Sequence, residues 1–308
     1  MTSEQRAFKG PGRLLGIDGG GSGTRVVLIV GGQVTALPDG PPMNALLTRG
    51  LTEHLRRIIA AAGPTAAGVG LPGVRMAAQA CHLGQALARQ AGCPVHVTGD
   101  VDAARHAAFL GAPGVVVVAG TGSAALGWDG ERFARAGGHG FLLGDEGSAY
   151  WIGREAVRAA LRFQEGSGGS EQIYRTVTEV TGSGLDALIA EVNAHPADRG
   201  RLAVLAPAVT AIAGHDPEAQ RIVRHAAESL AALAESIRRR LGPARTGAQL
   251  PVAGVGGVFG DPALWARFVE LTGAARPLAP AAVGAALLAA TCTPRSPTAP
   301  CSLHLDPA

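Results

Sequence analysis

The stretch Val95-His-Val-Thr-Gly-Asp100, followed by Val115-Val-Val-Val-Ala-Gly-Thr-Gly-Ser123, decides the fold. In both segments an apolar run leads directly into a polar turn that contains glycine. Such runs are typical of strands in an open α/β sheet, where side chains and free backbone N–H groups converge beyond the carboxyl ends of the strands. We therefore expect Asp100 to face a ligand-binding cleft.

The start of the chain follows the same pattern. The apolar run Leu14–Ile17 leads to Asp18-Gly-Gly-Gly-Ser-Gly-Thr24, and a second apolar run, Val26–Val30, follows. Apolar runs on both sides of a short glycine turn predict a β-hairpin. A P-loop or a dinucleotide-binding fingerprint would need a helix after the glycines, so neither fits. We expect the turn to wrap terminal phosphates with backbone N–H groups while the Asp18 carboxylate holds a hydrated magnesium ion.

A third glycine-rich segment runs from Gly137 to Gly153 and reads GGHGFLLGDEGSAYWIG. Together with Asp18–Thr24 and Gly120–Ser123, it resembles the N-acetylglucosamine kinase branch of the sugar kinase/Hsp70/actin superfamily, which also contains the BadF-type ATPases. The resemblance extends from about Leu14 to about Ala290. It implies an α/β fold of two actin-like (ribonuclease H-like) domains around a nucleotide-binding cleft.

The expected domains follow from this resemblance. Residues 1–112 would form an N-terminal actin-like domain, and residues 113–290 a C-terminal one with a helical insertion. Residues 291–308 are rich in proline, serine and threonine, which predicts a disordered tail.

The resemblance also implies an activity, the ATP-dependent phosphorylation of the 6-hydroxyl of an amino sugar. N-acetylglucosamine is the first expected substrate, and ATP and Mg²⁺ are the expected cofactors. Asp100 matches the family aspartate that accepts the proton of this hydroxyl. Asp102 is the rival candidate, although an acid in the first turn of a helix commonly just stabilises the helix dipole.

The expected nucleotide-binding residues come from four segments. Two are the glycine turns of the predicted hairpins, and the third is the strand and glycine turn Leu250–Phe259, which resembles the superfamily's adenosine motif. The fourth is the small-residue-rich helix near residue 284. The residues are Gly20, Gly21, Ser22, Thr24, Thr121, Gly122, Ser123, Gly256, Gly257 and Gly284.

The expected sugar-binding residues lie in loops. Asp145 can accept two hydrogen bonds from vicinal hydroxyls. Asn44 follows a turn-rich connection, Leu37–Pro42, and matches a family asparagine that contacts sugar hydroxyls, although asparagine also serves commonly in turns and N-caps. The complete set is Asn44, Gly73, Asp100, Thr121, His139, Gly140 and Asp145.

Two departures from the family pattern bear on the substrate. His139 stands where the family usually has tryptophan, and Pro72 stands where it often has serine. An imidazole changes the shape and polarity of the pocket that would hold the acetamido group. Glucosamine, another hexosamine or an anhydro-sugar therefore remain alternative substrates. The role of His139 as a simple replacement that bonds to backbone also remains open.

Two further alternatives belong to other functional classes. A BadF-type ATPase would couple ATP hydrolysis to electron transfer into a partner enzyme through a cysteine-bound iron–sulfur cluster. Such a cluster needs thiolates placed together, whereas Cys81 and Cys93 flank a predicted helix, and Cys292 and Cys301 lie near the end of the chain. A nucleotide-dependent sugar sensor without turnover is the other alternative.

Composition narrows the functional classes further. The chain has 308 residues, of which 47% are hydrophobic and 17% charged, as expected of a globular enzyme with room for two domains. A formal charge of +3 with dispersed arginines gives no reason to expect a nucleic-acid partner. No apolar stretch is long enough for a bilayer, and the cysteines show no metal-ligand spacing. We expect a cytoplasmic homodimer that binds a small-molecule sugar.

Overall fold

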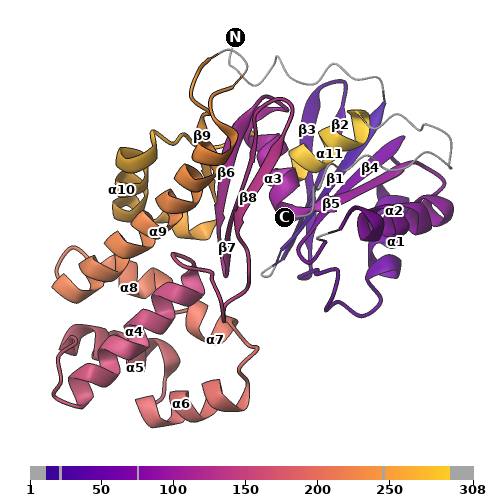
Figure 1. The fold of residues 1–308 in the computed structure, drawn as a ribbon. Helices are drawn as coiled ribbons and strands as arrows, with labels where there is room; N and C mark the ends of the chain where they lie inside the picture. Colours follow the sequence, from indigo (N-terminus) through magenta and orange to yellow (C-terminus); the bar gives the residue numbers. More distant parts are fainter. Residues whose placement is uncertain (1–11, 21–22, 75, 245–246, 292–308) are drawn as a thin grey trace. The chain divides into compact units, whose positions relative to one another are not determined.

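The structure, a computed structural model, describes residues 12–20, 23–74, 76–244 and 247–291. These residues divide into two compact units (Figure 1). The first contains the described parts of Met1–Gly114, Trp128–Phe133 and Pro277–Ala308, and the second contains Val115–Gly127 and Ala134–Arg276. Each unit has one sheet, so the chain is mixed α/β with two sheets, as predicted.

The first unit contains a five-stranded sheet of order β3-β2-β1-β4-β5. Its strands are β1 (Arg13–Gly19), β2 (Thr24–Val30), β3 (Gln33–Gly40), β4 (Ala66–Leu71) and β5 (Val95–Gly99). The antiparallel pairing of β1 with β2 confirms the predicted hairpin. In contrast, β4 runs parallel to β1 and β5 parallel to β4, so the carboxyl ends of β1, β4 and β5 share one edge.

Strand β3 corrects one expectation. Residues 37–40 were expected in a turn-rich connection, but they complete β3, and Leu37 pairs with Val26. A strand can contain Pro38 here because β3 is an edge strand, where a missing N–H need not interrupt a ladder. The pairing of β2 with β3 also shifts register between Thr24 and Val26, and proline is tolerated at such a bulge.

Helices cover both faces of this sheet. They are α1 (Leu51–Ala62), α2 (Ala77–Ala91), α3 (Asp100–Phe109) and α11 (Ala281–Thr291). Along β1, Leu15 and Ile17 belong to the buried cluster that includes side chains of α1 and α2, whereas Leu14 packs with residues of α11. This alternation follows from the two-residue period of a strand.

Helix α11 also changes the expected domain boundary, which had placed residues 113–290 in one C-terminal domain. Its small residues approach the sheet so closely that a Cβ on Gly16 would overlap the carbonyl oxygen of Ala282. A Cβ on Gly68 would overlap that of Ala285 in the same way. The helix therefore belongs to the first unit, to which the chain returns after Arg276.

The second unit contains a four-stranded sheet of order β8-β7-β6-β9. Its strands are β6 (Gly114–Ala119), β7 (Ser123–Trp128), β8 (Phe133–Gly137) and β9 (Val252–Val255). β6 and β9 are parallel, and an isolated parallel bridge joins Ala253 to Ala275 beyond β9. This bridge occupies the place that β5 takes in the first sheet. The two sheets thus repeat one strand order.

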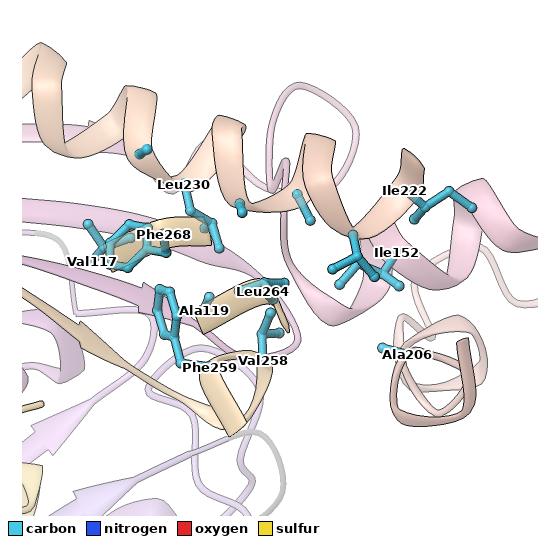
Figure 2. Packing of buried hydrophobic residues seen from close by; sticks show 14 of the residues in the cluster. Val117, Ala119, Ile152, Ala206, Ile222, Leu230, Val258, Phe259, Leu264 and Phe268 are labelled. Carbon is cyan, nitrogen blue, oxygen red and sulfur yellow. The ribbon is translucent and has the colours of Figure 1, made fainter. Parts of the chain in front are cut away.

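Helices bury the core of the second unit. They are α4 (Ala149–Gln164), α5 (Glu171–Thr181), α6 (Leu185–Ala194), α7 (Gly200–Ala203), α8 (Ala206–Ile212), α9 (Pro217–Leu241) and α10 (Pro262–Thr272), with the 3₁₀ helix η2 (Gly257–Gly260) after β9. Figure 2 shows Ile152 of α4 near Ile222 of α9, and Phe259 near Phe268. In the described part of the chain, none of the helices combines the length and the apolar character needed to span a bilayer.

Candidate functional site

Two predicted site residues lie at the edge where parallel strands of the first unit end. Asp18 is the penultimate residue of β1 and pairs in register with Gly70 of β4. Asp100 follows β5 directly and begins α3. Because β1, β4 and β5 are parallel, their carboxyl ends bring these two carboxylates to the same edge.

The electrostatics of Asp18 follow from this position. Burial, and secondarily the negative charge of Asp100, raise the pKa of Asp18 from 3.8 to about 7. Arg25, its partner across the hairpin, lowers the pKa but is outweighed. The two carboxylates are therefore close enough to repel one another, and a cation at this edge would relieve both burial and repulsion.

Asn44 and Gly73 lie side by side at the same edge. Asn44 Oδ1 accepts a hydrogen bond of 2.8 Å from the N–H of Leu46, so the side chain forms the turn that was considered as an alternative role. The neighbouring Ala45 N–H donates to the carbonyl of Pro72 at 2.9 Å. Gly73 has φ +87°, and a Cβ there would lie 2.9 Å from Asn44 Oδ1. The amide N–H groups of Asn44 are the donors that it can offer to a ligand.

Other residues predicted to bind nucleotide in this unit have internal partners. Gly20 N–H donates to the carbonyl of Gly23 at 2.9 Å, which closes the hairpin turn. The buried hydroxyl of Thr24 donates to Pro41 at 2.6 Å. Gly284 packs against α3, since a Cβ there would overlap the carbonyl oxygen of Ala103. The predicted residues Gly21 and Ser22 lie outside the described residues.

Glycine turns also share an edge in the second unit. Gly120–Gly122 follows β6, and Gly256 and Gly257 follow β9, which is parallel to β6. Gly256 has φ +115°, and a Cβ there would overlap the carbonyl oxygen of Ala119, so only glycine fits. At Gly257 a Cβ would meet open space. Thr121 is half-buried within the first of these turns, and its carbonyl accepts the N–H of Tyr150 at 3.4 Å.

Ser123 and Asp145 join the first turn to the 137–153 loop. Asp145 Oδ1 accepts the Ser123 N–H at 3.1 Å, and the Ser123 hydroxyl donates to the carbonyl of Glu146 at 2.8 Å. Both donor groups of Ser123 are thus used inside the unit, so we assign it to holding the loop and do not retain it as a nucleotide ligand.

Sequence reasoning missed Arg199, whose Nη1 donates to Asp145 Oδ2 at 3.3 Å. Asp145 itself is buried, 3% exposed, and has a positive φ of +63°. Arg199 precedes α7 and lies 54 residues from Asp145. Because it belongs to no glycine turn and no motif, the sequence offered no signal for this contact.

The remaining predicted sugar contacts lie in the same loop. His139 is exposed, and Gly140 has φ +84°. The loop packs closely against α9 at Gly147, where a Cβ would lie 2.6 Å from the carbonyl oxygen of Ala226. A loop that is held against a helix in this way and leaves His139 exposed can present this imidazole to a ligand.

The donor set at Asp18 suits magnesium. Among the residues that the structure describes, no three His, Cys, Asp or Glu side chains gather in a way that could hold a metal ion. Mg²⁺ does not require such a cage, because it keeps several waters and takes one or two carboxylates together with substrate phosphates. Asp18, with Asp100 nearby, provides that kind of incomplete site.

Comparisons with known proteins identify the family. Residues 15–289 match the profile of the BadF/BadG/BcrA/BcrD ATPase family. The chain belongs to this family. The match covers both sheets, so the BadF/BadG/BcrA/BcrD assignment applies to both units. It also confirms the resemblance that the sequence motifs suggested.

Individual relatives agree with the assignment to the BadF/BadG/BcrA/BcrD family. An N-acetylmuramic acid/N-acetylglucosamine kinase from Clostridium acetobutylicum is 43% identical over 67 residues, which are 21% of this chain and 22% of that protein. The match thus spans about a fifth of this curated relative's length.

Solved structures resemble the chain over most of its length. A protein from Chromobacterium violaceum, provisionally assigned as an N-acetylglucosamine kinase, has a TM-score of 0.69 and 27% identity and covers 90% of this chain and 98% of its own. A provisionally assigned N-acetylglucosamine kinase from Porphyromonas gingivalis has a TM-score of 0.69 at 20% identity, over 84% and 90% of the two chains. These likenesses confirm the predicted fold class.

Proposed function

We propose that this chain transfers the terminal phosphoryl group of ATP to the 6-hydroxyl of an amino sugar, with N-acetylglucosamine as the substrate. The observation that carries the proposal is the meeting of Asp18 and Asp100 at one sheet edge, close enough to raise the pKa of Asp18. A phosphotransferase needs one carboxylate for the metal and one for the attacking hydroxyl. The names of the relatives support the sugar as acceptor.

In this proposal Asp100 is the catalytic residue. It accepts a hydrogen bond from the 6-hydroxyl, holds the oxygen in line with the terminal phosphorus and takes the proton as the new P–O bond forms, while the bond from that phosphorus to the bridging oxygen breaks and ADP leaves. Asp102 lies in the same first turn of α3 and is assigned the helix-dipole role. Asp18 would hold Mg²⁺, which neutralises charge on the phosphates when bound.

Backbone groups bind the phosphates and the nucleoside. The turn from Gly20 to Thr24 and the turn of Thr121 and Gly122 supply contacts to the phosphates. Gly257 leaves room for the nucleoside, because a Cβ there would meet open space, and Gly256 lets the turn pack closely against Ala119.

Loop residues provide the contacts to the sugar. Asp145 accepts hydrogen bonds from two hydroxyls, and Asn44 donates through its amide nitrogen. Gly73, Thr121 and Gly140 contribute backbone contacts. His139 takes the place of the tryptophan that the resembling kinases use, and it sets the shape of the acetamido pocket.

Hydrolysis of ATP without sugar is the alternative from another class, since the family includes ATPases. It would require a cysteine-bound cluster for coupling to a partner enzyme. Cys81 lies in α2 and Cys93 follows the end of that helix, so about three helical turns separate the two described cysteines, and this favours the kinase. A hexosamine kinase is the alternative within the class, because His139 alters the pocket.

The test is ADP formation from ATP and Mg²⁺ with N-acetylglucosamine, glucosamine, glucose, N-acetylmannosamine or no sugar. We expect turnover that requires N-acetylglucosamine. Asp100→Asn should abolish it, whereas the matched variant Asp102→Asn should retain it. Equal turnover with and without sugar would reject the kinase assignment. Turnover with glucosamine alone would make glucosamine the substrate in place of N-acetylglucosamine. The homodimer inferred from the resemblance can be checked by sedimentation.

A further inference from the structure

The carboxylate of Asp145 is held from two sides. Ser123 donates its backbone N–H to Oδ1 at 3.1 Å, and Arg199 donates Nη1 to Oδ2 at 3.3 Å. The fit is close, since a Cβ on Gly122 would lie 2.9 Å from both carboxylate oxygens. The two donors come from different segments and fix the plane of the carboxylate.

The remaining acceptor capacity of Asp145 matches a pair of hydroxyls. An ionised carboxylate offers about four lone-pair sites, two on each oxygen. The Ser123 N–H uses one on Oδ1 and Arg199 uses one on Oδ2. One site is then left on each oxygen, which is the arrangement that two vicinal hydroxyls require.

Arg199 also supplies charge. The Asp145 side chain is 4% exposed, whereas the Arg199 side chain is 35% exposed. Removing one partner of a buried ion pair leaves an uncompensated charge and costs stability. The ion pair with Arg199 therefore offsets part of the cost of burying the Asp145 carboxylate.

We propose that Arg199 is a positioning residue for sugar binding, which orients the Asp145 carboxylate while two hydroxyls bind. The inference rests on the proposed sugar kinase activity and on Asp145 as the acceptor. It adds a residue from the turn between α6 and α7 to the site. Arg199 acts through Asp145 and makes no contact with the reacting atoms.

Arg201 provides a matched control. It lies two residues further on in α7, its side chain is 34% exposed, and it pairs with the surface carboxylates Glu191 and Asp198. Replacing either arginine by methionine removes one cation from the same region, since Arg199 directly precedes α7 and Arg201 lies within it. Loss of local stability therefore affects both variants, whereas loss of the Asp145 contact affects only one.

The experiment measures ADP formation by the wild type, Arg199→Met, Arg199→Lys and Arg201→Met, with sugar and ATP varied separately. For Arg199→Met we expect kcat/KM for the sugar to fall roughly tenfold to a hundredfold, with KM for ATP unchanged. Arg199→Lys should recover part of this loss.

The outcomes distinguish a failure of the proposed sugar kinase function from a failure of the role of Arg199. A wild type without sugar-dependent turnover overturns the proposed function and this inference together. A wild type that turns over sugar, with Arg199→Met and Arg201→Met behaving alike, overturns the inference alone. If Arg199→Met does not fold, the lysine variant decides: a kcat and a sugar KM identical to those of the wild type contradict a role that depends on guanidinium geometry.

Discussion

The carboxylates of Asp18 on β1 and Asp100 at the start of α3 repel one another at a single sheet edge, and this repulsion adds to burial in raising the pKa of Asp18 to about 7. The unfolded chain, with an Asp18 pKa near 3.8, releases its proton first as the pH rises. Without a bound cation, the folded state therefore loses stability between those two pKa values.

The first prediction concerns the stability that the folded state loses when Asp18 ionises. Asp18→Asn, measured in chelator by denaturant unfolding, should be more stable than the wild type at pH 7.5 by about 2–4 kcal/mol. At pH 3.5, where Asp18 is mostly protonated in both states, the two proteins should have similar free energies of unfolding. A wild type more stable than the variant at pH 7.5 would show that Asp18 is not destabilised by its surroundings.

The half-buried side chain of His106 should make the free energy of unfolding depend on pH in the opposite direction. Burial, and then the positive charges of Arg105 and His96, lower the pKa of His106 from 6.5 to about 4. The unfolded chain therefore gains a proton first as the pH falls, and the folded state loses stability below pH 6.5. His106 Nδ1 is buried without a hydrogen-bond partner, so His106→Phe removes no bond at that atom.

We expect His106→Phe to exceed the wild type in stability by about 1–2 kcal/mol at pH 5, and this advantage should shrink above pH 7. Denaturant unfolding at the two pH values measures the change. An advantage of equal size at both would assign the effect to packing rather than to protonation.

The third prediction tests the packing of α11. Gly68→Ala places a methyl group onto the carbonyl oxygen of Ala285, where backbone cannot yield cheaply. We expect a loss of at least about 3 kcal/mol or no folded protein. Gly214→Ala is the control, because a Cβ there meets nothing within 4 Å. A Gly68→Ala protein as stable as the control would contradict the close approach of this helix.

Local chemistry made the hairpins predictable. The glycine turn after Asp18 and the one after Ala119 stand between apolar runs, and such turns depend on nearest neighbours. The position of Asp100 directly after a strand also followed, since ligand-binding residues of open α/β sheets gather beyond the carboxyl ends of strands. These features required no knowledge of long-range packing.

Features that depend on distant contacts were not predictable. Leu37–Gly40 contains proline and glycine and suggests a turn, but its pairing with β2 makes it an edge strand. Helix α11 joins the first unit through contacts with Gly16 and Gly68, which lie more than two hundred residues earlier. Arg199 reaches Asp145 across 54 residues. In each case tertiary packing decides what the local sequence leaves open.

The position of the transferred phosphate tests the central claim most directly. Wild-type protein, ATP, Mg²⁺ and N-acetylglucosamine should give equal amounts of ADP and a sugar phosphate, and phosphorus–proton NMR correlation should place the phosphate on the 6-oxygen. Equal amounts of ADP and inorganic phosphate, with the sugar unchanged, would contradict the account and assign this chain to ATP hydrolysis.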